Sequence, residues 1–140
     1  MRFQLVDRVV ERSADRLVSV KAVTAAEEYL GDHFPGFPVL PGVMMLEALV
    51  QAARELVTDG GETGPLVVGD VRNVKYGNMV RPGQTLQVEV TLRGRDEAGF
   101  DFQGTGTVEG SIAVQGRFRL VPLDTLSGAG TGASAKPHAA

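Results

Sequence analysis

The feature that most constrains the fold is residues 43–57, VMMLEALVQAARELV, which contain neither glycine nor proline. The run is rich in strong helix formers, and its first two turns are apolar on nearly every side. It therefore predicts one long, buried central helix. Such a helix must be covered on more than one face, and a single curved sheet cannot cover it completely. We therefore expect a second copy of the chain to cover the rest, as a homodimer.

Strand-like segments lie on both sides of this helix in the sequence. Residues 3–10 and 16–23 are β-branched and roughly alternating, with a polar turn between them, and they predict a hairpin. Four further strands are predicted after the helix, at residues 66–74, 85–94, 100–108 and 111–121, with turns at 81–83, 96–99 and 109–110. This order predicts an α+β fold in which an antiparallel sheet wraps around one long helix.

The ends of the predicted domain are less regular. Thr24, followed three residues later by Glu27, has the spacing of a capping box and predicts a short helix that ends near Gly31. Residues 124–140 are small, polar and aperiodic, which indicates a disordered tail. We therefore expect one domain at residues 1–123 and a tail at 124–140.

Composition excludes several classes of function. Lysine and arginine total 14 against 17 aspartates and glutamates, and no basic run is present, so we expect no nucleic-acid partner. The absence of cysteine excludes disulfides, cysteine nucleophiles and thiolate metal sites. The N-terminus has charges at positions 2, 7 and 8 without an apolar signal core, and no apolar run reaches membrane-spanning length. The expected location is the cytoplasm, with no membrane partner.

One stretch stands out chemically, the sequence HFPGFPVLPGVMMLE at residues 33–47. Its prolines at 35, 38 and 41 fix the backbone φ at every third residue and stiffen the chain. Proline is common at the first position of a helix, which accounts for Pro41 but not for the other two.

Glu47 lies among apolar residues of the predicted helix, with Gln51 one turn further on the same face. Loss of solvation favours the neutral form of a carboxylic acid, which can donate a proton. A core glutamate satisfied by Gln51 and a backbone donor is the structural alternative, and His33 alone is equally compatible with a structural role. Together, however, His33, Glu47 and the helix N-terminus at Gly42 provide a base, an acid and an oxyanion donor. This set suits proton abstraction beside a carbonyl, followed by loss of a β-leaving group.

The motif at 33–51 closely resembles the active-site motif of the 3-hydroxyacyl-acyl-carrier-protein dehydratases of bacterial fatty-acid synthesis, the FabZ and FabA type, which have the hotdog fold. Residues 5–9, LVDRV, resemble that family's N-terminal strand, and the Pro-Gly turn at 81–83 falls where the family has one, so the resemblance covers about residues 3–121. Glutamate at position 47, with no cysteine beside Gly42, is more similar to the FabZ branch.

The resemblance implies a role for each matching residue. His33 would take the α-proton of a 3-hydroxyacyl thioester, and Glu47, which the partner subunit contributes in this family, would assist departure of the β-hydroxyl as water. The backbone N–H of Gly42 would bind the thioester carbonyl. The carbonyl of Val39 would accept a hydrogen bond from His33, and Gln51 would orient Glu47. Elimination of water changes no net oxidation state, so no metal or other cofactor is expected.

The resemblance also implies a tunnel and a docking surface. The acyl tunnel would be lined by Phe37, Met44, Tyr76 and Met79. The family has an aromatic residue followed by Lys-Arg-Pro, whereas this chain has Tyr76-Gly77-Asn78-Met79 and so lacks the two basic residues. Docking of acyl carrier protein would then depend on the remaining cations, Arg54, Arg72, Lys75 and Arg81. Asp32 replaces a glycine that is common before the histidine. A homodimer is expected, with assembly into a trimer of dimers left open.

The sequence leaves three functions in competition. The leading one is dehydration of (3R)-3-hydroxyacyl chains on acyl carrier protein to trans-2-enoyl thioesters, in fatty-acid or polyketide synthesis. An acyl-thioester hydrolase on the same fold would leave the histidine-to-glutamate motif unexplained. A non-catalytic acyl-binding subunit of a heteromeric dehydratase would have no chemical reason to retain both His33 and Glu47.

Overall fold

The computed structural model describes residues 4–24, 40–59 and 65–123. In chain order its elements are β1 (Arg8–Arg12), β2 (Arg16–Ala22), α2 (Gly42–Asp59), β3 (Leu66–Tyr76), β4 (Thr85–Arg95), β5 (Phe100–Val108) and β6 (Ser111–Pro122). Two strands, one long helix and four further strands follow one another as the sequence predicts, which confirms the α+β class.

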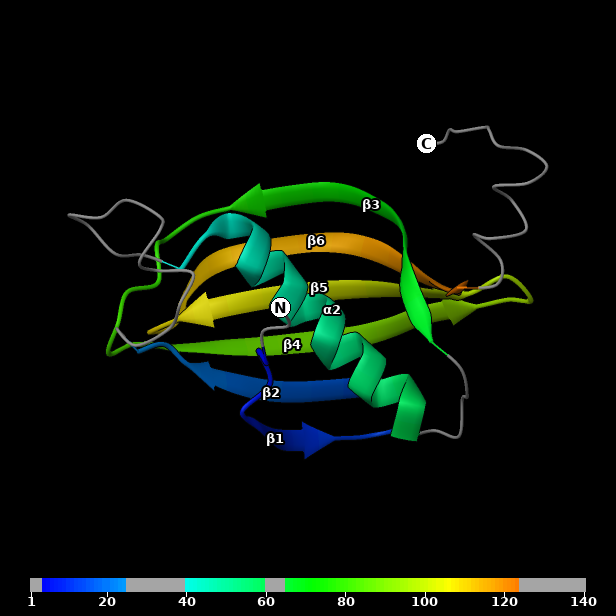
Figure 1. The fold of residues 1–140 in the computed structure, drawn as a ribbon, viewed down its shortest axis with the longest axis horizontal. Coiled ribbons are helices and arrows are strands. Elements are labelled where there is room, and N and C mark those ends of the chain that lie inside the picture. Colours follow the sequence, from blue (N-terminus) through cyan, green and yellow to red (C-terminus); the bar gives the residue numbers. More distant parts are fainter. Residues whose placement is uncertain (1–3, 25–39, 60–64, 124–140) are drawn as a thin grey trace.

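The strands form one antiparallel sheet in the order β1-β2-β4-β5-β6-β3, so that β1 and β3 are its edges. Helix α2 runs obliquely across one face of this sheet, and the sheet curves around it, with β3 arching past the helix (Figure 1). The core lies between the helix and the concave face of the sheet. The other face of the sheet is directed away from α2.

Alternation along the strands produces this core. In β5, residues alternate strictly between buried and half-buried positions, as expected of a strand with one face on the core. Phe102 lies directly opposite Phe118 in β6, and their stacked rings have centroids 5.6 Å apart. At Gly104 the helix lies close to the sheet. A Cβ added to this glycine would stand only 3.1 Å from Cδ1 of Leu49. The glycine therefore lets α2 lie close to β5.

The predicted central helix is confirmed, and one sheet covers most but not all of it. Ala48, Leu49, Ala52 and Ala53 are completely buried against the sheet. At the first turn Val43 is 70% exposed, which agrees with the expectation that one curved sheet cannot cover the helix completely. Among the described residues, the concave sheet covers one side of the helix and Val43 lies exposed on another side.

The strand boundaries differ modestly from the predictions. The first strand begins at Arg8 rather than at residue 3. Three residues before it, the N–H of Leu5 donates to the side chain of Gln51 in α2. The hairpin between β5 and β6 turns at Glu109 and Gly110, both with positive φ, as a two-residue type I′ turn requires. The predicted helix at 24–31, apart from Thr24, and the tail at 124–140 lie outside the described residues, so the domain division stays a prediction.

Candidate active site

Helix α2 presents a polar stripe on its open side. Glu47, Gln51, Arg54 and Thr58 follow one another at spacings of four, three and four residues, which places them on one helix face. The intervening Ala48, Leu49, Ala52 and Ala53 are buried on the opposite side. The amphipathic pattern of the helix therefore directs Glu47 away from the core.

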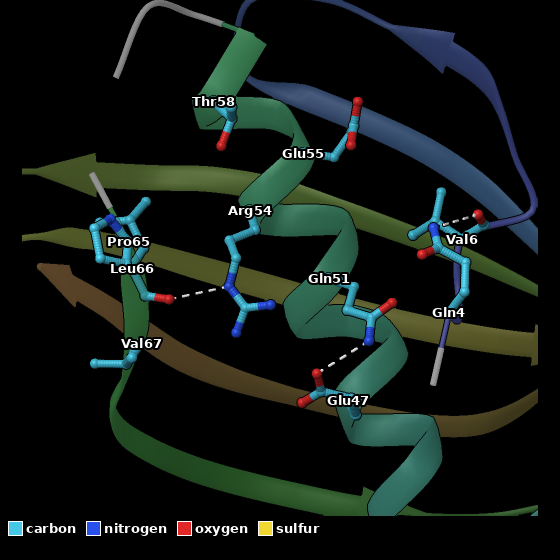
Figure 2. A pocket seen from close by; sticks show the side chains of 10 residues that line it. All are labelled: Gln4, Val6, Glu47, Gln51, Arg54, Glu55, Thr58, Pro65, Leu66 and Val67. Atoms are coloured by element: carbon cyan, nitrogen blue, oxygen red, sulfur yellow. Dashed lines mark hydrogen bonds between the residues drawn. The ribbon is translucent and has the colours of Figure 1, made fainter. Parts of the chain in front are cut away.

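The polar stripe forms one wall of a cavity of about 500 Å³. The other walls come from the segment before β1 and from the start of β3 (Figure 2). Its lining residues are Gln4, Val6, Glu47, Gln51, Arg54, Glu55, Thr58, Pro65, Leu66 and Val67. The cavity thus brings together three parts of the chain around the predicted acid, Glu47.

The carboxylate of Glu47 is half-buried and held by its neighbour on the helix. Oε2 of Glu47 accepts a hydrogen bond of 3.1 Å from Nε2 of Gln51, and Oε1 of Gln51 accepts one of 2.8 Å from the backbone N–H of Leu5. The contact between Gln51 and Glu47 has the geometry that the sequence predicts. Leu5 was not predicted as part of the site, and no sequence signal links a residue before the first strand to the central helix.

Arg54 also lies in this cavity. Its Nε donates to the carbonyl oxygen of Leu66 at 3.0 Å, which ties α2 to the first residue of β3 (Figure 2). The family resemblance implies a docking role for Arg54. Arg54 follows Glu47 by seven residues, which is two helical turns. This spacing predicts that the two side chains lie on the same face of the helix, so the position of Arg54 near the acid could have been predicted from the sequence.

The start of α2 faces the end of β3. Gly42 is the first residue of the helix, where backbone N–H groups have no acceptor within the helix. The ring of Tyr76 packs against it, and Tyr76 itself is 51% exposed. Of the other predicted tunnel residues, Met44 is half-buried beside the core and Met79 is exposed. A hydrogen bond from Leu40 N to Val80 O, 2.7 Å long, brings the residues before the helix beside the segment that contains Met79.

The remaining motif residues, His33, Phe37 and Val39, lie outside the described residues. Their roles stay predictions. The structure does place the end of the motif, since Met44 N and Met45 N both donate to the carbonyl of Pro41 as the helix begins.

Three of the four predicted docking residues line different hollows. Arg54 lines the Glu47 cavity, whereas Arg72 lines a separate hollow with Arg93 and Arg117. Lys75 lies near the end of β3, and Arg81 lines a third hollow, beside Gly77, Asn78 and Met79. Arg81 therefore shares a hollow with Gly77 and Asn78, which occupy the positions of the family motif's basic residues.

Two further properties concern the described part of the chain only. Across residues 4–24, 40–59 and 65–123, no three histidine, aspartate or glutamate side chains are grouped as a metal site would require. Within the same ranges, no helix combines the length and the hydropathy needed to span a membrane.

Comparison with known families adds independent information. The family model described as ApeI-like, ApeI dehydratase, matches residues 9–117. The chain is 38% identical over 122 residues to the 3-hydroxyacyl-[acyl-carrier-protein] dehydratase FabZ of Pseudothermotoga lettingae, covering 87% of this chain and 81% of that protein. It is 39% identical over 116 residues to FabZ of Lactococcus lactis subsp. cremoris, covering 81% of each.

Solved structures show the same architecture. The dehydratase heterocomplex ApeI:P from Xenorhabdus doucetiae matches with a TM-score of 0.72 at 20% identity, over 85% of this chain and 82% of that chain. Thioesterase superfamily member 2 from Mus musculus matches with a TM-score of 0.62 at 16% identity, over 80% and 78%. At these identities the likeness concerns the fold alone, and it confirms the predicted hotdog fold. With the sequence relatives and the family model, it leads to one assignment: the chain belongs to the FabZ-type, ApeI-like family of 3-hydroxyacyl-[acyl-carrier-protein] dehydratases.

Proposed function

We propose that this dehydratase removes water from (3R)-3-hydroxyacyl chains held as thioesters on acyl carrier protein, giving trans-2-enoyl thioesters. The observation that supports it most directly is the position of Glu47, half-buried in a 500 Å³ cavity and oriented by Gln51. An acid in the wall of a cavity can protonate the leaving hydroxyl group of a substrate bound there. The FabZ relatives are named for the same reaction.

The proposed steps use groups of the chain itself. His33 takes the α-proton of the thioester, the electron pair forms the new double bond, and the β-hydroxyl departs with a proton from Glu47 as water. Charge that develops on the thioester oxygen is stabilised by the N–H of Gly42, since the positive end of the α2 dipole lies there. The carbonyl of Val39 would fix the tautomer of His33.

A homodimer is part of the proposal, with His33 of one protomer acting beside Glu47 of the partner. Three exposed hydrophobic side chains, Val43, Tyr76 and Met79, lie at or near the start of α2 and its neighbouring segments, where a second copy would cover them. A trimer of dimers would extend this arrangement. Acyl carrier protein is the proposed partner that holds the substrate, and the cytoplasm is the proposed location.

The test is hydration of a 2-enoyl thioester, followed by loss of enoyl absorbance. We expect His33→Ala and Glu47→Gln each to lose about 10²- to 10⁴-fold in rate, the usual contribution of a general acid or base. Matched controls are His138→Ala, at the chain's other histidine, and Glu97→Gln, at an exposed turn. Near-wild-type rates in Glu47→Gln would remove Glu47 from the mechanism.

A second readout separates the competing functions. Release of free thiol without change in the enoyl group would indicate a thioesterase. Binding of the acyl thioester without turnover, in the purified homodimer, would indicate a non-catalytic subunit. Either result would overturn the proposed reaction.

A further inference from the structure

We infer that the segment before β1 is a positioning element for the acid: the backbone N–H of Leu5 fixes the side chain of Gln51, and so determines which oxygen of Glu47 delivers the proton. The inference rests on the proposed function, because it concerns the role of Glu47 as proton donor. Figure 2 shows Gln51 extending from α2 between Glu47 and the stretch that contains Gln4 and Val6.

The orientation of the Gln51 amide follows from Leu5. A backbone N–H can only donate, so the amide atom that faces Leu5 at 2.8 Å must be the carbonyl oxygen of Gln51. The opposite orientation would place two donors against each other. The NH₂ group of Gln51 is therefore the group that donates to Oε2 of Glu47, at 3.1 Å. Leu5 thus makes Gln51 an obligatory donor to Glu47.

This orientation distinguishes the two oxygens of Glu47. A neutral carboxylic acid has one oxygen that bears the proton and one that only accepts. Because Oε2 faces the NH₂ donor of Gln51, the accepting oxygen is Oε2, and the acidic proton belongs on Oε1. The geometry thereby assigns Oε1 as the atom from which the proton passes to the leaving hydroxyl.

The segment that provides the Leu5 N–H is anchored at Leu5 itself and again at Asp7. The Leu5 side chain is completely buried in the core. Two residues later, Asp7 N donates to the carbonyl of Val20 at 2.9 Å, and a carboxylate oxygen of Asp7 accepts from Ala22 N at 2.7 Å. A support that is itself fixed by packing and hydrogen bonds can hold a catalytic group in one geometry.

The test compares Leu5→Pro with Leu5→Ala. Both substitutions shorten a buried side chain and leave a void, but only proline removes the N–H. We expect the kcat of Leu5→Pro to fall about three- to tenfold below that of Leu5→Ala, the range that corresponds to one hydrogen bond, with KM unchanged. Equal kcat values in the two folded variants would overturn the inference.

A second comparison isolates the route through Gln51. In a Gln51→Met background the amide is absent, so Leu5→Pro and Leu5→Ala should have the same kcat. A persistent additional loss in that background would show that proline acts by general distortion, and would overturn the inference.

If Leu5→Pro does not fold, replacement of residue 5 by the α-hydroxy acid of leucine removes the N–H and keeps the side chain, and the same three- to tenfold loss is expected. An undiminished kcat in that ester variant would overturn the inference. Failure of the proposed function appears separately, as an active Glu47→Gln or an inactive wild type.

Discussion

The ring of Tyr76 lies against the backbone of Gly42, so closely that a Cβ on Gly42 would stand 3.1 Å from Cε1 of the ring. This contact joins the last residue of β3 to the first residue of α2. It places an aromatic wall beside the helix N-terminus, where we propose that the thioester carbonyl binds. A side chain at position 42 would displace either the ring or the helix start.

We therefore expect Gly42→Ala to lower kcat by about tenfold, because an oxyanion donor acts only in its correct position. The matched control is Gly69→Ala, whose Cβ would stand equally close, 3.1 Å, to side-chain atoms of Val121. Steady-state kinetics and urea unfolding of both variants are the measurements. Similar losses of activity in the two would contradict a special role for the helix start.

Arg54 and Arg81 should respond differently to the form of the substrate. Arg54 is half-buried in the Glu47 cavity and bonded to Leu66 O, so Arg54→Gln should lower rates on carrier-linked and small-thiol-linked substrates by similar factors. Arg81 is exposed, so Arg81→Gln should raise KM only for the carrier-linked substrate, by a few-fold, as expected of a charge at the rim of an interface. If Arg54→Gln instead raised KM only for the carrier-linked substrate, Arg54 would be a docking residue.

The sequence predicted much of the fold because local patterns determine it. The apolar, glycine-free run at 43–57 is a strong helix signal, and the alternation in 100–108 gives a strand with the same bounds in the structure. The Glu-Gly pair at 109–110 has the left-handed backbone of a tight hairpin. The contact between Gln51 and Glu47 follows from helical periodicity alone, since residues four apart share a face.

What the sequence did not predict depends on contacts between distant segments. The Leu5 N–H reaches Gln51 across 46 residues, and Arg54 reaches Leu66 O only because β3 begins beside the helix. Exposure of Val43, by contrast, agrees with the expectation that one curved sheet leaves part of the helix uncovered. The described single chain leaves that side of α2 open.

Packing of α2 on β5 gives a prediction about stability. Leu49 is completely buried and its side chain lies against Gly104. Leu49→Ala should cost about 2–5 kcal/mol of unfolding free energy, and Gly104→Ala about 1–3 kcal/mol through overpacking. The double variant should be less destabilised than the sum, by roughly 1 kcal/mol or more, because the added methyl group partly fills the void left by Leu49.

Urea unfolding of the four proteins measures this coupling. Leu49→Ala combined with Gly69→Ala is the control, since Gly69 contacts Val121 rather than the helix. Additive costs in the Leu49 and Gly104 pair would show that the two positions do not share one packing contact.

The turn between β4 and β5 should make stability depend on acid pH. The N–H groups of Ala98 and Gly99 and the guanidinium of Arg119 all donate to Asp96, and they hold the pKa of Asp96 below its ordinary value, with the Ala98 hydrogen bond as the largest cause. A carboxyl group whose pKa is lower in the folded state stabilises the protein above its unfolded pKa of about 3.9, and this contribution is lost as the pH falls through the folded value.

Asp96→Asn keeps the acceptor oxygen for the two backbone N–H groups and removes the charge opposite Arg119. We therefore expect the wild type to be more stable than Asp96→Asn at pH 7, and the difference in urea midpoint to shrink as the pH is lowered below about 4. The effect should be small, because Asp96 is solvent-exposed and its pairing with Arg119 is weakened by water and salt. Glu97→Gln removes a neighbouring charge without changing the hydrogen bonds of this turn, and serves as the control. A difference between wild type and Asp96→Asn that stays constant from pH 7 to pH 3 would mean that the charge of Asp96 does not stabilise the fold.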